Sequence, residues 1–379
     1  MSTSGVEIRR GLMGVYFDRS ESCFIDGSIG KLLYRGYDIH ELAEQSTFEE
    51  VTYLLLQGSL PTRSELSAFD SQLRSDREIP DGVVDIIDKV KGGHPMDVLR
   101  TAVSALSAWD PEVKDNSPEA IIRKGLRLTA KAPTIVTTHE RLRNGLDPVK
   151  PNPDLNHSGN FLYMLRGHEP EEEEIHIMDV DFILHAEHGS NASAFASRVT
   201  ASTQSDLHSA VVSGIATLKG PAHGGAAEEV MKMAEEIGRP ENAAAYARNI
   251  LDNGGRVMGF GHRVYKAEDP RARHLRERSK TLGEAKGQPH WFEILTNLQE
   301  VMKPYQSRGI FVNVDFFAGS IYYLMGIPDD LFISIFALGR IPGWTLNVVE
   351  QYSNNILIRP LTEYTGPMDQ PYVSIDRRN

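Results

Sequence analysis

Residues 46–61 read STFEEVTYLLLQGSLP, and this stretch contains the signals from which the fold is predicted. Ser46 and Glu49 have the spacing of a capping box, in which a hydroxyl and a carboxylate bind free N–H groups of a first helical turn. An apolar helix over residues 48–57 should follow. Gly58 should end it, because glycine readily adopts the left-handed conformation that closes helices. The stretch therefore predicts a helix with both ends encoded locally.

Similar signals recur along the chain. Ser117 and Pro118 suit the cap and first turn of a helix running toward Arg143, which Pro133 should kink or divide. Residues 23–25 and 32–34 flank a glycine-containing turn and predict one small N-terminal hairpin. The chain is thus predicted to be mainly α, without the βαβ alternation of a Rossmann sheet. Further helical patterns cover residues 179–188, 192–199, 206–218, 226–237, 241–251, 271–282, 291–302, 316–325 and 344–351.

The composition narrows the classes of function. The chain has 379 residues and one cysteine, Cys23, so it can build a large core and needs no disulfide. A net charge of −12 argues against general nucleic-acid binding, and an anionic ligand would need a local cluster of arginine and lysine. The N-terminus lacks a secretory signal, and no apolar run approaches the ~18 residues of a membrane helix. We therefore expect a cytoplasmic protein with neither nucleic-acid nor membrane partners.

His223 lies in GPAHGGA, residues 220–226, directly before a predicted helix. The positive end of a helix dipole disfavours imidazolium, so the ring should be neutral. A neutral ring can donate an N–H hydrogen bond to a carbonyl oxygen that becomes an enolate. The alternative is a histidine that only caps the helix, and spacing alone does not decide between the two.

The motif GFGHRVYKAEDPR, residues 259–271, places His262, Lys266 and Arg271 beside tight glycine turns. Glycine allows the backbone to approach a ligand closely, and the basic side chains suit an anionic ligand with a polarisable carbonyl. GFG alone would indicate an ordinary loop, whereas the complete thirteen-residue pattern is far more specific.

Asp315 lies at the predicted start of a helix, where most aspartates are N-caps. The functional alternative is a carboxylate base in a dry site, where desolvation would raise its pKa. Taken one at a time, Arg340 and Arg359 would each be interpreted as an ordinary arginine of the surface or of an ion pair. Together with Arg271 they could clamp a dicarboxylate, because guanidinium binds carboxylate bidentately.

His185 and His188 are three residues apart on a predicted helix, which raises the possibility of a metal site. HAEH matches neither HExxH nor HxxEH, and no second carboxylate motif completes a zinc ligand set. A core histidine or a substrate contact is the preferred interpretation, and no metal is expected.

GPAHGGA, GFGHRVYKAEDPR and NVDFFAG, in this order and at these separations, resemble the citrate synthase family. The run GLMGVYFDRSESCFIDGSIGKLLYRGYDIHELAEQSTFEEVTYLLLQGSLPT, residues 11–62, is similar to the start of its shorter bacterial and archaeal members. The resemblance covers nearly the whole chain and implies a large helical domain with a smaller helical domain inserted in it. Residues 1–223 and 327–379, which include a proline-containing C-terminal arm, would form the large domain, and residues 224–326 the small one. The extra N-terminal β-domain of NADH-inhibited members is not recognised, so NADH regulation is not expected.

The resemblance implies a reaction in which acetyl-CoA, oxaloacetate and water give citrate and CoA, without a cofactor. His223 would stabilise the enol of acetyl-CoA, His262 would polarise the oxaloacetate carbonyl, and Asp315 would remove the methyl proton. The residues that would hold oxaloacetate are His188, Arg271, Arg340 and, from the neighbouring subunit of a homodimer, Arg359. Those that would contact CoA are Met258, Gly259, Phe260, Gly261 and Lys266.

Three competing interpretations remain open at this point. A 2-methylcitrate synthase would use propionyl-CoA on the same fold, or the enzyme would accept both acyl groups, since one methylene changes discrimination by only about 10- to 200-fold. A helical metallohydrolase would be built on the histidines at positions 185, 188, 223 and 262. A non-catalytic helical scaffold would leave the glycine-flanked histidines without a use.

Overall fold

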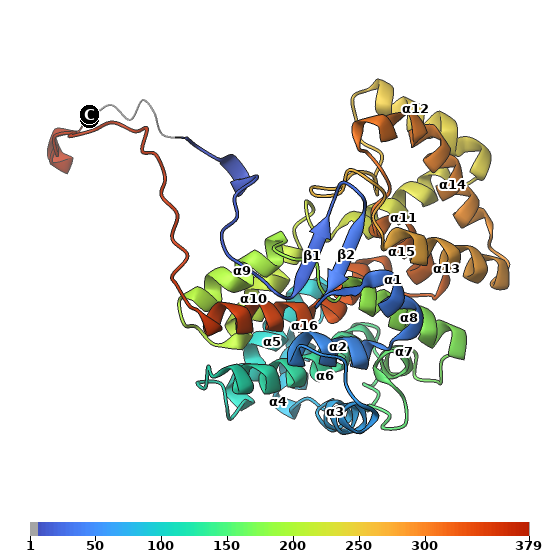
Figure 1. The fold of residues 1–379 in the computed structure, drawn as a ribbon, viewed down its shortest axis with the longest axis horizontal. Coiled ribbons are helices and arrows are strands. Elements are labelled where there is room, and N and C mark those ends of the chain that lie inside the picture. Colours follow the sequence, from blue (N-terminus) through green and yellow to red (C-terminus); the bar gives the residue numbers. More distant parts are fainter. Residues whose placement is uncertain (1–6, 379) are drawn as a thin grey trace.

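The fold is mainly α, as predicted. The computed structural model describes residues 7–378, and this range contains sixteen α-helices and one three-stranded sheet. The main body of the molecule contains α1 (Ile39–Gln45), α2 (Phe48–Gln57), α3 (Arg63–Ser75), α4 (Asp81–Val90), α5 (Pro95–Leu106), α6 (Pro118–Arg143), α7 (His157–Arg166), α8 (Glu172–His185), α9 (Ala192–Ser202), α10 (Leu207–Leu218) and α16 (Phe332–Ser353) (Figure 1).

Five further helices pack on one another and lie together at one end of the molecule (Figure 1). They are α11 (Ala226–Ile237), α12 (Ala243–Asp252), α13 (Ala272–Ala285), α14 (His290–Met302) and α15 (Asp315–Leu324). We call them the α11–α15 group. The domain boundaries at residues 223/224 and 326/327 stay predictions.

Helix α16 forms the centre of the main body. It packs against α2, α5, α6, α8, α9 and α10, and its residues from Phe332 to Val348 are all buried. Among the described helices it alone is long and apolar enough to cross a membrane, but 94% of its apolar window is buried inside the molecule. A helix that is apolar on every face and surrounded by other helices is a core helix.

One local prediction about helix capping is wrong, and the predicted division of a helix at Pro133 does not occur, while a kink there stays a prediction. The N-cap of α2 is Thr47, whose side chain accepts the N–H of Glu50, while Ser46 donates its hydroxyl to the Glu50 carboxylate (2.6 Å). The capping interaction is therefore shifted by one residue from the predicted pair. Pro133 does not divide α6, which is continuous from Pro118 to Arg143, because buried contacts on several sides outweigh the local cost of proline.

The predicted hairpin is present as β1 (Cys23–Asp26) and β2 (Lys31–Tyr34), paired antiparallel. A short third strand, β3 (Tyr37–Asp38), was not predicted. The turn of the hairpin touches the GFGHRVYK motif, because the carbonyl of Gly27 accepts the N–H of Lys266 at 2.7 Å. The sheet is thus hydrogen-bonded to a loop that contains predicted site residues.

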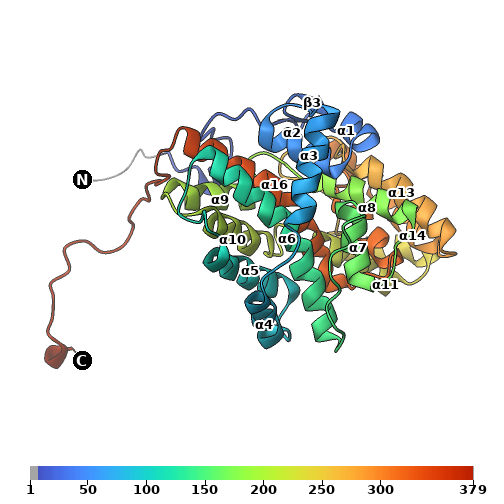
Figure 2. The same cartoon turned by 90° about the horizontal axis from the view of Figure 1, so that it is seen from below.

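The chain beyond α16 has no α-helix in its described part and is mostly exposed. Figures 1 and 2 both show this C-terminal segment leaving the body of the molecule. Large apolar side chains along it are exposed, among them Leu361 (87%) and Tyr372 (86%).

Candidate active site

The predicted site residues come from widely separated segments that meet between the main body and the α11–α15 group. His188 follows α8, and its ring centroid lies 5.2 Å from that of His262, in the loop before α13. Arg340 and Phe336 lie on α16, and the Phe336 ring is 6.3 Å from the ring of His223. The fold therefore gathers histidines that are up to 74 positions apart in the sequence, the difference between 188 and 262.

His262 has a defined tautomer. Its Nδ1 accepts the backbone N–H groups of Val264 (3.0 Å) and Tyr265 (3.1 Å). A ring nitrogen that accepts N–H groups carries no proton, so the proton of the neutral ring is on Nε2. Burial, followed by the charge of Arg271, lowers the pKa of His262 to about 4. His262 is therefore a neutral donor through Nε2 near pH 7.

His223 has the opposite tautomer. Its Nε2 accepts the backbone N–H of Ser193 at 3.3 Å and lies 2.9 Å from the Ser193 hydroxyl. The ring proton is consequently on Nδ1. Burial, followed by the charge of Arg340, lowers the pKa of His223 to about 4, so this ring is also neutral. The alternative role as a helix cap is excluded, because the N-cap of α11 is Gly225 and no side chain caps that helix.

Asp315 is not an N-cap, although its position in the sequence is typical of one. The N-cap of α15 is Val314, no side chain caps the helix, and Asp315 is its first residue. The side chain is 8% exposed. Burial raises the pKa of Asp315 to about 6, against the opposing effect of Arg271. The carboxylate is therefore a stronger base than an exposed one, and it remains ionised at neutral pH.

Asn313, which the sequence analysis missed, joins the segment of the base to the loop of His262. Its backbone N–H donates to the carbonyl of Gly259 (3.0 Å), its side-chain amide donates to Gly261 (3.2 Å), and its side-chain oxygen accepts the N–H of Asp315 (3.1 Å). Gly259 has φ of 78°, and a Cβ there would lie 2.5 Å from the Phe316 ring. The glycine thus permits both the turn and its close contact with α15.

His188 is buried and is held by a second residue that the sequence analysis missed. Its Nε2 lies 3.0 Å from the hydroxyl of Tyr265, which is 1% exposed. Burial, followed by the charge of Arg271, lowers the pKa of His188 well below its usual value. Tyr265 belongs to the GFGHRVYK motif, so the motif itself was the signal that could have found it.

Arg271 and Arg340 are both buried, but their partners differ. Arg271 forms a two-bond ion pair with Asp269 (2.9 and 2.7 Å), and this carboxylate raises the pKa of Arg271 although burial opposes it. Arg340 donates Nε to the carbonyl of His185, while its Nη1 and Nη2 have no partner. Two buried, unpaired guanidinium nitrogens fit a carboxylate ligand, which they bind bidentately.

The remaining predicted residues lie at the edge of this site or outside it. Met258 and Phe260 are half-buried, and the Phe260 ring packs 4.7 Å from the Phe316 ring. Lys266 is exposed. Arg359 is exposed on the C-terminal segment that leaves the molecule (Figure 1), and so is not gathered with the other arginines within one chain.

The histidine pair proposed as an alternative metal site does not share a helix. Helix α8 ends at His185, and His188 follows it, so the predicted helical range 179–188 extends too far. In residues 7–378, no group of three or more His, Cys, Asp or Glu side chains is placed to hold a metal ion.

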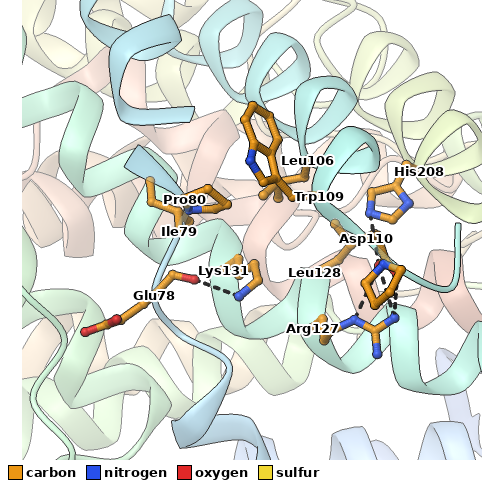
Figure 3. Close-up of a pocket in the computed structure, with 11 residues that line it drawn as sticks. Glu78, Ile79, Pro80, Leu106, Trp109, Asp110, Arg127, Leu128, Lys131 and His208 are labelled. Carbon is orange, nitrogen blue, oxygen red and sulfur yellow. Dashed lines mark hydrogen bonds and ion pairs between the residues drawn. The ribbon is translucent and has the colours of Figure 1, made fainter. Parts of the chain in front are cut away.

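A cavity of about 380 Å³ lies elsewhere in the main body, and none of the predicted site residues lines it. Figure 3 shows its charged side chains. Arg127 pairs with Asp110 (2.8 Å) and Glu112 (2.8 Å), and Lys131 donates to the carbonyls of Asp76 and Glu78 (both 2.6 Å). The cations of this cavity are thus bound by the protein itself.

Three comparisons with known proteins agree with one another. The model of the family described as "Citrate synthase, C-terminal domain" matches residues 11–361. A citrate synthase of Deinococcus radiodurans is 47% identical over 98% of this chain and 99% of its own length. A 2-methylcitrate synthase of Corynebacterium glutamicum is 40% identical over the whole of both chains.

A solved structure of Thermoplasma acidophilum citrate synthase, a ternary complex with carboxymethyl coenzyme A and oxaloacetate, is 32% identical. It matches with a TM-score of 0.94 over 98% of this chain and all of that one. Fold, site and relatives define an acyltransferase-type enzyme that forms a carbon–carbon bond. The chain belongs to the citrate synthase family.

Proposed function

We propose that this enzyme condenses acetyl-CoA with oxaloacetate and hydrolyses the thioester, giving citrate and CoA. The observations that carry the proposal are a buried carboxylate, Asp315, which Asn313 joins to the loop of His262, and two neutral histidines with opposite tautomers. Each histidine has one free N–H, so each can serve one oxygen. The reaction has two oxygens that gain negative charge, the thioester oxygen and the ketone oxygen.

The first step is removal of a methyl proton from acetyl-CoA. Asp315 takes the proton, and Nδ1–H of His223 donates to the thioester oxygen as the C–H electrons move toward it. A carboxylate alone is too weak a base for this carbon acid, so the donor has to stabilise the enolate as it forms. Because the pKa of His223 is low, its ring is neutral when the substrate binds. The raised pKa of Asp315 makes its carboxylate a stronger base.

In the second step, the nucleophilic carbon attacks the ketone of oxaloacetate. Nε2–H of His262 polarises this ketone and transfers its proton to the new alkoxide. Arg271 and Arg340 hold the carboxylates, and His188 lies beside His262, where it contacts the same ligand. Water then hydrolyses the resulting thioester and releases CoA. Fixing both substrates in this geometry supplies much of the rate.

A homodimer completes the site in this proposal. Arg359 is exposed on a segment that leaves its own chain, together with apolar side chains that a partner subunit would bury. It reaches the dicarboxylate of the neighbouring subunit. Residues 224–326 form the smaller domain, whose closure over oxaloacetate excludes water before acetyl-CoA reacts. The Met258–Gly261 backbone and Lys266 contact CoA.

A second candidate function is the condensation of propionyl-CoA to 2-methylcitrate. It is favoured by the relative of that name, which is 40% identical over the whole of both chains. The base, the histidines and the arginines serve both reactions.

In this proposal the enzyme is cytoplasmic. It requires no metal or cofactor, since the chain's own residues supply every proton transfer.

A thiol-release assay tests the proposed function. Acetyl-CoA and propionyl-CoA are each incubated with the enzyme, with and without oxaloacetate. We expect thiol release from acetyl-CoA only when oxaloacetate is present, unchanged by excess chelator. A higher kcat/KM for propionyl-CoA would assign the second function, and absence of release with either acyl-CoA would contradict both.

A further inference from the structure

Glu187 is a fully buried carboxylate for which the proposed mechanism has no use. It lies between α8 and His188 and is 0% exposed. One carboxylate oxygen, Oε2, accepts the side-chain amide of Asn347 at 3.1 Å, while Oε1 has no partner. A buried carboxylate that is only half satisfied is costly to folding, so its position calls for a functional reason.

The carboxylate lies against Arg340. Gly343 follows Arg340 by one helical turn, and a Cβ on Gly343 would lie 2.5 Å from Oε2 of Glu187 and 3.2 Å from Cδ of Arg340. The glycine therefore leaves the space in which the carboxylate approaches the arginine side chain. No direct ion pair joins Glu187 and Arg340 in residues 7–378, and both guanidinium Nη atoms remain unpartnered.

We infer that Glu187 is a positioning residue of the dicarboxylate subsite, and that it takes up a proton from solvent when a substrate carboxylate binds Arg340. This inference rests on the proposed function. Without substrate, ionised Glu187 offsets the charge of Arg340 in a site with little water. A bound carboxylate takes over that role, and a second negative charge beside it becomes unfavourable.

The ionisation of Glu187 falls in the range that this role needs. Burial raises its pKa to about 7, against the opposing effect of Arg340 and with a further increase from Glu350. Substrate binding should raise the pKa further, because another negative charge then lies nearby. A free site above pH 7 therefore contains an ionised Glu187, and an occupied site contains its protonated form.

The thiol and phenol groups beside Glu187 do not ionise near pH 7. Cys23 on β1 is half-buried, and burial raises the pKa of its thiol. Burial likewise raises the pKa of Tyr34 on β2, whose hydroxyl accepts the backbone N–H of Glu187 at 3.3 Å. From the α11–α15 side, Arg271 faces the site as a permanent charge.

Asn347 is fixed so that its amide N–H₂ faces Glu187. Its Nδ2 also donates to the carbonyl of Gly343 (2.9 Å), and its Oδ1 accepts Nη1 of Arg198 (3.4 Å). Arg198 is itself held by Asp18 (2.7 Å) and Glu350 (3.0 Å). Because an arginine can only donate, the orientation of the Asn347 amide follows from its partners.

The test is the pH dependence of oxaloacetate binding in the wild type and in Glu187→Gln. In the wild type, KM for oxaloacetate should rise above pH 7, approaching tenfold per pH unit if one proton is taken up. Glu187→Gln mimics the protonated carboxyl, so its KM should stay nearly constant between pH 7 and 9, while kcat keeps its wild-type pH dependence. Calorimetry of oxaloacetate binding at pH 8 in two buffers of different ionisation enthalpy should show an uptake of about one proton that the variant loses.

Two further variants guard against trivial outcomes. Glu49→Gln removes another buried carboxylate, on α2, whose pKa burial raises and which accepts the N–H of His157 at 2.7 Å. This variant shows whether the loss of any buried carboxylate disturbs the fold enough to change KM. It should keep the wild-type rise in KM for oxaloacetate above pH 7. Asn347→Ala removes the donor to Glu187, so the rise should begin at higher pH.

The outcomes separate the two proposals. A wild-type enzyme without thiol release contradicts the proposed function. An active wild type whose KM does not rise above pH 7, or a Glu187→Gln variant that keeps the full rise and the proton uptake, overturns the role of Glu187 and leaves the proposed function standing.

Discussion

The cavity of Figure 3 and the candidate active site both contain arginine, histidine and aspartate, yet their charges are arranged differently. In the cavity, Arg127 has two carboxylate partners, and His208 lies 3.6 Å from Asp110. In the active site, Arg340 keeps two nitrogens without a partner. Ion pairs that the protein completes by itself are structural, whereas the unpartnered nitrogens of Arg340 lie in the candidate active site and suit an anionic ligand.

The free energies support this distinction. Removing a charge from water costs several kcal/mol, and hydrogen-bond donors of a buried arginine that lack a partner add to this cost in the free protein, even where a carboxylate such as Glu187 offsets part of the charge. Such an arrangement is retained where a ligand supplies the missing partner. Arg271 is intermediate, because Asp269 already pairs with it and holds it in place before any ligand arrives.

The largest expected effect is on catalysis. Asp315→Asn should lower kcat by about 10³- to 10⁴-fold, because the amide cannot accept the methyl proton. The matched change in the cavity, Asp110→Asn, should leave kcat within about twofold, since that carboxylate lies outside the candidate active site, where it pairs with Arg127 and His208. Steady-state thiol release measures both, and a D110N enzyme as inactive as D315N would break the comparison.

Replacing the two arginines should affect substrate binding differently. Arg340→Met should raise KM for oxaloacetate by about 30-fold or more, because the side chain that binds a substrate carboxylate is removed. Arg127→Met should leave KM unchanged and lower the free energy of unfolding by about 1 kcal/mol or less, because Arg127 is half-buried, Asp110 keeps His208 and Glu112 keeps Arg123. Oxaloacetate titrations and urea denaturation provide the two readouts. An equal rise of KM in both variants would count against the distinction.

Mixing two inactive variants tests the proposed contribution of Arg359 from the partner subunit. Asp315→Asn and Arg359→Leu homodimers should both be nearly inactive. After mixing under conditions that allow subunit exchange, heterodimers contain one site without either change, so part of the activity should return. No recovery despite proven exchange would place Arg359 in the site of its own chain or outside both.

The smallest effect is on the acidic side of the pH profile. Because the pKa of Asp315 is raised to about 6 in the free enzyme, the base becomes protonated below that pH, and kcat/KM should fall about tenfold per pH unit there. His223 contributes little, since its pKa of about 4 keeps it neutral over this range. A kcat/KM that stays constant down to pH 5 would show that another group is the base.

The sequence was sufficient to predict the mainly α fold and the hairpin at β1 and β2. The structure brings His188 close to His262, while the roles of the site residues stay predictions. Local sequence patterns failed where contacts between distant residues decide how far a helix extends. Helix α16 was predicted only over residues 344–351, because Pro342 and neighbouring glycines conceal a helix that surrounding helices stabilise from Phe332 to Ser353.

Other features of the site depend on three-dimensional contacts that no local pattern encodes. The tautomers of His262 and His223 follow from backbone N–H groups, one of them donated by Ser193, thirty positions from His223. The roles of Asn313 and Glu187 depend on partners brought together by folding. The contribution of Arg359 from a neighbouring subunit was predicted from family resemblance alone, and a single chain leaves this residue outside the site.

The central claim is that Asp315 removes a proton from the acyl methyl group while neutral His223 stabilises the enolate. It is tested most directly by deuterium exchange into the methyl group of acetyl-CoA in D₂O, measured by mass spectrometry. Malate, which has no ketone to attack, occupies the dicarboxylate site. The wild type should incorporate deuterium, and Asp315→Asn should not. Incorporation by Asp315→Asn at the wild-type rate would contradict the account.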